Sequence, residues 1–281
     1  MKNKMKKPVA VPVNKLHPFD GNPYKVIDND EMDTLVESIQ NIGITNPLIV
    51  RPIENTEDEY EVISGHRRLY ASKKAGLEKV PAFIYAIDRD EAAVMLVDSN
   101  LHRERILPSE KAFAYKMKSE ALKHQGITCG QLGHKSRDDV SDTESGRNVQ
   151  RYIRLTNLIP ELLEMMDDGK IALSVGVELS YLDDERQYDI LNMCEVNDCT
   201  PSFSQATRMH KLSSAGELDD YAVAEIMNEQ KANQKTFIKI SEERAKGLIP
   251  SGYFGKQAED YVVKALEHYS KYLKKQKDYS R

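Results

Sequence analysis

The chain has 281 residues, 40% of them hydrophobic, and a formal net charge of −5 at pH 7. This length suits two or three modest domains, and the apolar content is sufficient for each to form a core. The sequence has no run of about 18 apolar residues and no apolar stretch after its lysine-rich start, so we exclude a membrane span and a secretory signal and expect a cytoplasmic protein.

The first part of the chain, to about residue 100, alternates short β-rich runs with helical ones. The predicted elements are a strand over 9–13, a helix over 31–41, strands over 47–51 and 60–63, a helix over 66–75, a strand over 80–85 and a helix over 90–98. Gly43 and Gly76 follow the first two helices, where glycine commonly ends a helix. The alternation predicts a small mixed α/β domain.

The rest of the chain is predicted to be helical. Pro108 and Glu110 fall in a first helical turn, where both residue types are favoured. The last helix places its apolar residues on one stripe, formed by Ala258, Tyr261, Val262, Ala265, Leu266, Tyr269, Tyr272 and Leu273. We interpret this stripe as core packing within its own domain, with a dimer seam as the alternative.

These elements predict an α+β protein with three parts. Residues 1–105 form the mixed N-terminal domain and residues 106–182 an all-helical middle domain. Residues 183–281 form a helical C-terminal region.

A basic corner is predicted where the strand over 60–63 turns into the next helix. The segment from Ser64 to Ala71 contains Gly65, Arg67 and Arg68, so free backbone N–H groups and the positive end of the helix dipole lie beside two guanidinium groups. Such a corner suits phosphates, although solvent-exposed helix arginines are an equally good interpretation. A second cluster, Asn100 to Arg105, follows the next helix and is alternatively a charged linker.

Charge is segregated along the chain. Residues 101–124 carry six Lys or Arg against three Glu, whereas residues 156–200 carry eleven Asp or Glu against two Lys or Arg. A net negative charge argues only weakly against nucleic-acid binding, because phosphate contacts need local positive charge.

A helix from Ser145 to about Thr156 is the candidate DNA reader. Ser145 can cap it, three arginines fall at i, i+4 and i+7, and Val149, Tyr152 and Ile153 fall on the other side. Residues 137–143 are the expected first helix of a helix-turn-helix. An arginine-faced surface helix is the alternative. The candidate DNA-binding residues are Arg147, Asn148, Gln150, Arg151 and Arg154, since arginine suits guanine edges and Asn or Gln suits adenine edges.

From about Val9 to Leu182, several sequence motifs resemble those of the ParB family of chromosome and plasmid partition proteins and occur in the same order. The segment 43–51 is similar to the family's Gly…Pro-Leu-x-Val-Arg box, and 65–71 resembles its Gly-Glu-Arg-Arg-x-x-Ala box. The segment 99–103 resembles Glu-Asn-x-x-Arg, and 106–112 resembles Leu-x-Pro-x-Glu-x-Ala. The helix near Ser145 occupies the position of the family's helix-turn-helix.

The resemblance implies a pocket for CTP, with Mg²⁺ as an accompanying ion. Carried over by position, the residues at the phosphate end are Gly65, His66, Arg67, Arg68, Asn100 and Arg103. Those nearer the base are Thr45, Asn46, Pro47 and Leu48. Two family glutamates are replaced here, by His66 and Ser99, which removes two carboxylates that could hold a metal or orient water. The sequence therefore predicts nucleotide binding and leaves weak CTP hydrolysis an open question.

The resemblance implies a nucleoid-associated homodimer that recognises a palindromic, centromere-like duplex and loads as a clamp. A ParA-type ATPase is the implied protein partner, which the lysines at positions 2, 4, 6 and 7 could contact. A transcriptional regulator or nucleoid-occlusion factor of the same fold is one alternative. A nucleotide-dependent enzyme of the related sulfiredoxin fold is another, although Gly65 stands where the sulfiredoxin cysteine would be.

Overall fold

A mixed sheet forms the N-terminal part of this computed structural model, which describes residues 7–101, 103, 106–124, 144–229, 247–250, 252–253 and 255–279. The five strands have the order β1-β5-β3-β4-β2. Their bounds are β1 Val9–Pro12, β2 Leu16–Pro18, β3 Leu48–Pro52, β4 Tyr60–Ser64 and β5 Lys79–Ile84. β1 pairs with β5 and β3 with β4 in antiparallel fashion, whereas β3 with β5 and β2 with β4 are parallel.

Helices cover both faces of this sheet. α2 (His66–Lys74) places Leu69 on one face, in a cluster with Val50 and Val62. Ile63 faces the other way and is buried in a cluster with residues of α3 (Arg89–Leu101) and α4 (Pro108–His124). The alternation of Val62 and Ile63 between the two clusters follows from the period of two in a strand.

α1 (Asp30–Ile42) packs on α2 rather than directly on the sheet. Asn29 caps its first turn by accepting a hydrogen bond from the N–H of Met32. Met32, Val36 and Ile39 are buried at helical spacing, so one apolar stripe faces Ala71 of α2. The helix ends at Gly43, whose φ of +78° a residue with a side chain rarely adopts.

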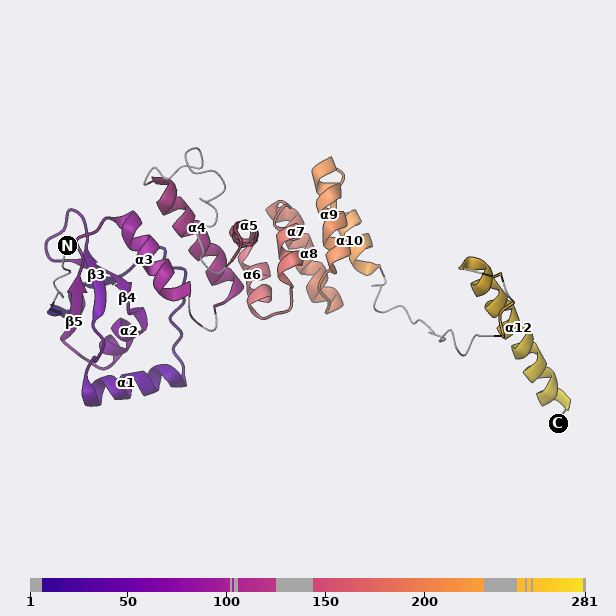
Figure 1. Ribbon diagram of the computed structural model, residues 1–281, viewed down its shortest axis with the longest axis horizontal. Coiled ribbons are helices and arrows are strands. Elements are labelled where there is room, and N and C mark those ends of the chain that lie inside the picture. The colour runs from indigo at the N-terminus through magenta and orange to yellow at the C-terminus, as the bar shows by residue number, and fades with distance from the viewer. Residues whose placement is uncertain are drawn as a thin grey trace. The chain divides into compact units, whose positions relative to one another are not determined.

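The helical half is built around one continuous core. After α4 come α5 (Gly146–Arg154), α6 (Pro160–Asp167), α7 (Leu173–Leu179), α8 (Asp184–Asn197), α9 (Phe203–Ala215) and α10 (Asp220–Asn228). Short 3-10 turns lie between β1 and β2, at Val13–Lys15, and between α5 and α6, at Leu155–Asn157. Buried residues from Leu155 to Met227 form one cluster with Ala112 of α4. α4 contacts α3 on one side and α5 and α6 on the other (Figure 1).

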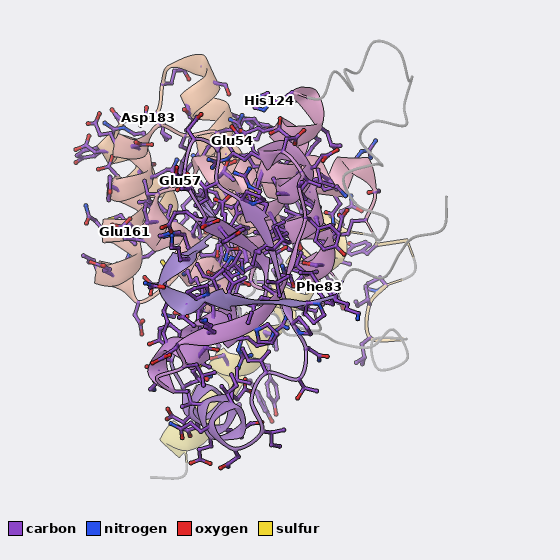
Figure 2. The ribbon with its side chains drawn as sticks, turned by 90° about the vertical axis from the view of Figure 1, so that its left-hand side faces the viewer. Glu54, Glu57, Phe83, His124, Glu161 and Asp183 are labelled. Atoms are coloured by element: carbon purple, nitrogen blue, oxygen red, sulfur yellow. The ribbon has the colours of Figure 1, made fainter. Side chains whose placement is uncertain are left out.

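The predicted α+β class is confirmed, and most predicted elements lie within two residues of the observed ones. β2 is a strand that the sequence did not predict, because it has only three residues and two of them, His17 and Pro18, are not typical of strands. The predicted domain boundary at residue 182 falls inside the cluster from Ala112 to Met227 and stays a prediction. The acidic block lies on the helical half, where Glu161 is in the first turn of α6 and Asp183 is the N-cap of α8 (both labelled in Figure 2).

Residues 230–281 form a second unit, described here by itself. Its helix α12 (Lys256–Tyr279) carries the predicted apolar stripe. Leu266 and Tyr269 of that stripe are each 58% exposed, and Tyr272 is 51% exposed. Core packing is therefore not observed for these side chains within the described residues of this unit, and the dimer seam stays a prediction. Within the described residues, no helix combines the length and apolar character needed to cross a membrane.

We expect the substitution Ile190→Ala to lower the free energy of unfolding by about 2–5 kcal/mol, because it leaves a cavity in the helical core. Ile190 lies on α8 and is fully buried, whereas Val196 on the same helix is 78% exposed. Val196→Ala is the matched control and should change stability by less than about 0.5 kcal/mol. Urea unfolding followed by circular dichroism measures both, and equal effects would contradict this account of the core.

Candidate functional site

The turn from β4 into α2 is made by Gly65, which has a φ of +107°. A Cβ atom there would lie 3.0 Å from Nη2 of Arg68 and 3.1 Å from Cγ of Leu48, so a larger residue would meet both steric and backbone strain. No side chain caps α2, in contrast to Asn29 at α1 and Ser145 at α5. The first N–H groups of α2 therefore form a corner suited to an anion.

Arg68 folds back onto the loop before β3. Its Nη1 donates hydrogen bonds to the carbonyl oxygens of Asn46 and Pro47, the latter at 2.9 Å. Partial burial lowers the pKa of its guanidinium. The structure thus brings together five predicted residues, Asn46, Pro47, Leu48, Gly65 and Arg68, with Thr45 exposed next to them in the chain.

Arg67 points to a different partner. Its Nη2 lies 3.3 Å from Oε2 of Glu31 on α1, and both side chains are largely exposed. The two neighbouring guanidinium groups, which the sequence predicts to grip one ligand, have separate partners in this structure. Neither lines the cleft beside them.

That cleft has a volume of about 590 Å³ and lies between the segment from Pro18 to Val26 and α2. Of the ten predicted nucleotide residues, only His66 lines it. The backbone N–H of Phe19 donates to Nε2 of His66 at 3.3 Å. Burial and, secondly, the positive charge of Arg103 lower the pKa of His66 to about 4, so its imidazole is neutral at pH 7.

Arg103 and Asn100 approach the same region from the end of α3. The guanidinium carbon of Arg103 lies 5.3 Å from the ring centroid of Tyr24. Asn100 is buried and its side-chain amide donates to the carbonyl of Leu96 at 2.7 Å, so this side chain supports the end of α3. Burial raises the pKa of Tyr24, whose buried hydroxyl has no hydrogen-bond partner among the described residues.

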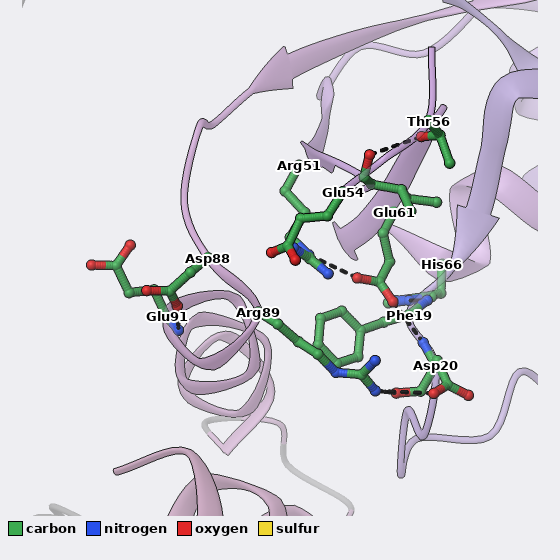
Figure 3. Close-up of polar contacts among 11 residues, drawn as sticks. Phe19, Asp20, Arg51, Glu54, Thr56, Glu61, His66, Asp88, Arg89 and Glu91 are labelled. Atoms are coloured by element: carbon green, nitrogen blue, oxygen red, sulfur yellow. Dashed lines mark hydrogen bonds and ion pairs between the residues drawn. The ribbon is translucent and has the colours of Figure 1, made fainter. Parts of the chain in front are cut away.

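A buried ion pair that the sequence analysis did not identify holds the segment after β2. Arg51 of β3 and Glu61 of β4 pair across the sheet, with Nε and Oε2 2.8 Å apart (Figure 3). The other oxygen of Glu61 accepts from the backbone N–H of Asp20 at 2.9 Å, and Asp20 pairs with Arg89 at 3.0 Å. The sequence signal for this ion pair was one charged residue inside each of two apolar strands, Arg51 in β3 and Glu61 in β4.

The same segment is tied to α4 through Glu110. One carboxylate oxygen accepts from the N–H of Lys25 at 3.0 Å, and the other accepts from the N–H of Leu107 at 3.2 Å.

Among the described residues, no group of three or more His, Cys, Asp or Glu side chains could hold a metal ion. A divalent ion at this site would have to take most of its ligands from a nucleotide and water.

α5 has the N-cap and the apolar side that the sequence predicts. The Ser145 hydroxyl accepts from the N–H of Asn148, as expected for its cap. Val149 is fully buried in a cluster with Tyr115, and Tyr152 and Ile153 pack against them, which confirms the predicted apolar side. Residues 137–143, the expected first helix of the helix-turn-helix, lie outside the described residues.

The candidate groove residues of α5 have different environments. Arg147 and Gln150 are exposed, whereas Arg151 and Arg154 are both only partly exposed. The side-chain amide of Asn148 donates to Oε2 of Glu144 at 2.5 Å. Arg154 is turned inward, with its guanidinium carbon 3.9 Å from the ring centroid of Tyr181. The outward side of α5 is therefore formed by the exposed Arg147 and Gln150, with the partly exposed Arg151 beside them.

Comparison with known proteins gives a family match for the first part of the chain. Residues 1–101 match the family model for the ParB N-terminal domain. A nucleoid occlusion protein of Listeria innocua is 31% identical over 191 residues, which cover 67% of this chain and 63% of that protein. The chromosome-partitioning protein Spo0J of Thermus thermophilus is 32% identical over 177 residues, covering 63% of this chain and 61% of that protein.

A solved structure of the C-terminally truncated ParB of Caulobacter crescentus, complexed with CTP-γ-S, is 22% identical. The match covers 64% of this chain and 94% of the Caulobacter chain, with a TM-score of 0.33. The chain spans between one half and just under two thirds of the length of the curated relatives named nucleoid occlusion protein.

We expect the stability of this protein to fall as pH decreases from about 6.5 to about 4, in part because of His66. The pKa of His66 in the folded chain, about 4, lies below its ordinary value of about 6.5, so the unfolded chain takes up the proton first. Above about pH 6.5 the group is neutral in both states and has no effect. Each pKa unit corresponds to about 1.4 kcal/mol.

Urea unfolding of the wild type and His66→Asn at several pH values measures this contribution. The difference in unfolding free energy between the two should change across the window, whereas His268→Asn, which alters an exposed histidine of α12, should follow the wild type. Parallel curves for His66→Asn and the wild type would refute the assignment of His66 as a buried neutral group.

Proposed function

This chain belongs to the ParB N-terminal domain family through residues 1–101, and from that premise we propose that it is a nucleoid-associated partition or nucleoid-occlusion factor that binds a specific duplex site. The relatives at about 30% identity carry both of these names. The proposal assigns DNA reading to α5 and nucleotide binding to the start of α2.

The observation that carries the DNA assignment is the two-sided character of α5. Its apolar side is held against Tyr115 of α4 by Val149, so the opposite side faces outward, with Arg147 and Gln150 exposed and Arg151 partly exposed. An α-helix fits the major groove, where arginine can bond guanine and glutamine can bond adenine. A palindromic site would be read by two copies of the chain, one for each half-site.

CTP is the proposed nucleotide, and the support for its site is the uncapped start of α2. The N–H groups there, Arg67 and Arg103 would bind the phosphates, while Arg68 holds the loop at Asn46 and Pro47 that would lie nearer the base. Arg67 can leave Glu31 at little cost, because an exposed ion pair contributes only about 0–1 kcal/mol. The bound nucleotide supplies the negative charge that draws these cations together.

Clamp loading, a homodimer and a ParA-type ATPase partner belong to the partition version of this proposal. A regulator or nucleoid-occlusion factor would use the same α5 without the ATPase. Hydrolysis of CTP has little support at the site, because His66 is neutral and the Ser99 hydroxyl donates to the carbonyl of Leu96 at 2.9 Å. Neither residue supplies the carboxylate that a water-activating site would use.

We expect Arg147→Ala and Arg151→Ala each to weaken specific DNA binding by about 1–3 kcal/mol, since each removes a groove contact. The probe is a duplex enriched from a random library by the wild-type chain, compared with a scrambled duplex of the same composition. Arg208→Ala, which removes the same side chain from an exposed position on α9, is the control and should have no effect. Unchanged specific affinity in both α5 variants would remove α5 as the reading helix.

We expect the wild type to bind CTP in preference to ATP, GTP and UTP, and Arg67→Ala to weaken CTP binding by at least about tenfold through loss of a charge-assisted hydrogen bond. Isothermal titration calorimetry with each nucleotide measures this. Lys123→Ala, an exposed cation on α4, is the control. If the wild type binds none of the four nucleotides, the site at the start of α2 is wrong.

A further inference from the structure

Arg154, Tyr181 and His210 form a three-layer stack in the helical half. The guanidinium carbon of Arg154 lies 3.9 Å from the ring centroid of Tyr181, and the imidazole of His210 lies 4.1 Å from the same centroid with the rings 10° from parallel. Two groups this close to one centroid must occupy opposite faces of the ring. Tyr181 is therefore sandwiched between a cation and an aromatic ring.

Polar contacts at both ends hold this stack in place. Nη2 of Arg154 donates to the carbonyl of Ser180 at 3.2 Å, and Nδ1 of His210 lies 2.7 Å from Oε2 of Glu178. The Nε of Arg154 is buried and has no hydrogen-bond partner among the described residues. The residue as a whole is partly exposed, but the stacking on Tyr181 and the hydrogen bond to Ser180 direct its guanidinium toward the protein and away from a phosphate or a base edge.

The stack joins three elements at the C-terminal end of α5. Arg154 is the last residue of α5, Tyr181 follows α7, and His210 lies on α9. The N-terminal half of α5 has a separate attachment, because Val149 packs on Tyr115 of α4. A nine-residue helix held at two points along its length has a set direction relative to α4, α7 and α9.

We propose that Arg154 is a positioning residue that sets the direction of α5 through Tyr181, rather than a groove contact as its sequence spacing predicts. This inference rests on the proposed DNA-binding function of α5. The stack keeps Arg147 and the partly exposed Arg151 at the angle needed to enter a groove. A cation stacked on a ring contributes about 0.5–2 kcal/mol, which corresponds to about a 2- to 30-fold change in an equilibrium constant.

The two roles of Arg154 predict different responses to charge. A phosphate contact would be retained by Arg154→Lys, and its loss in Arg154→Ala would lower the slope of log affinity against log salt by about 0.9. A positioning residue depends on the planar guanidinium, so lysine should not replace it. Its loss should lower specific affinity and leave both the salt slope and the affinity for scrambled duplex unchanged.

The experiment measures binding of the full chain to the selected and scrambled duplexes at several salt concentrations. The variants are Arg154→Ala, Arg154→Lys, Tyr181→Leu and Tyr181→Phe, with Tyr188→Leu on α8 as the control for loss of a similarly exposed tyrosine. We expect the first three to weaken specific binding about 2- to 30-fold, and Tyr181→Phe to retain wild-type affinity because the ring remains. Arg154→Ala and Tyr181→Leu should be non-additive when combined.

Rescue by Arg154→Lys, a reduced salt slope in Arg154→Ala, or unchanged affinity in Tyr181→Leu would each overturn the proposal. Circular dichroism at the binding temperature confirms that each variant is folded. If Arg154→Ala does not fold, Tyr181→Leu and Tyr181→Phe still decide the question. Failure of the DNA-binding function is distinguishable, because Arg147→Ala and Arg151→Ala would then also have no effect.

Discussion

The paired charges of Arg51 and Glu61 are buried where two central strands meet, and neither charge has enough water around it to be stable alone. Removing one partner of such a pair costs about 3–5 kcal/mol, because the other charge remains buried. Glu61 also binds the backbone N–H of Asp20, so the pair fixes the start of the segment that borders the cleft. One wall of the cleft thus depends on a contact made within the sheet.

α4 transmits this order from the sheet to the helices. Glu110 near its start binds the N–H of Lys25 in the segment beside the cleft. The preceding residue, Ser109, donates its N–H and hydroxyl to the carboxylate of Asp167 at the end of α6, at 2.9 and 2.5 Å. Farther along, Tyr115 supports α5. One helix is therefore in contact with the surroundings of both candidate sites.

Periodicity and capping residues in the sequence were sufficient to predict the fold class, nearly all the helices and strands of the N-terminal half, and the two-sided character of α5. These features depend on contacts within a few residues, such as Ser145 with Asn148 or the spacing of Met32, Val36 and Ile39. The short strand β2 was missed because its pairing with β4, and not its own composition, makes it a strand.

Side-chain direction was decided by tertiary structure. Arg67 and Arg68 are adjacent in sequence, yet one faces Glu31 and the other the loop at Asn46, because neighbouring helix residues point about 100° apart and meet different elements. Arg154 shares the helical spacing of Arg147 and Arg151, but the ring of Tyr181, 27 residues later in the chain, draws it inward. Sequence spacing places residues on a face of a helix, whereas the partners packed against that face determine which of them remain free to bind.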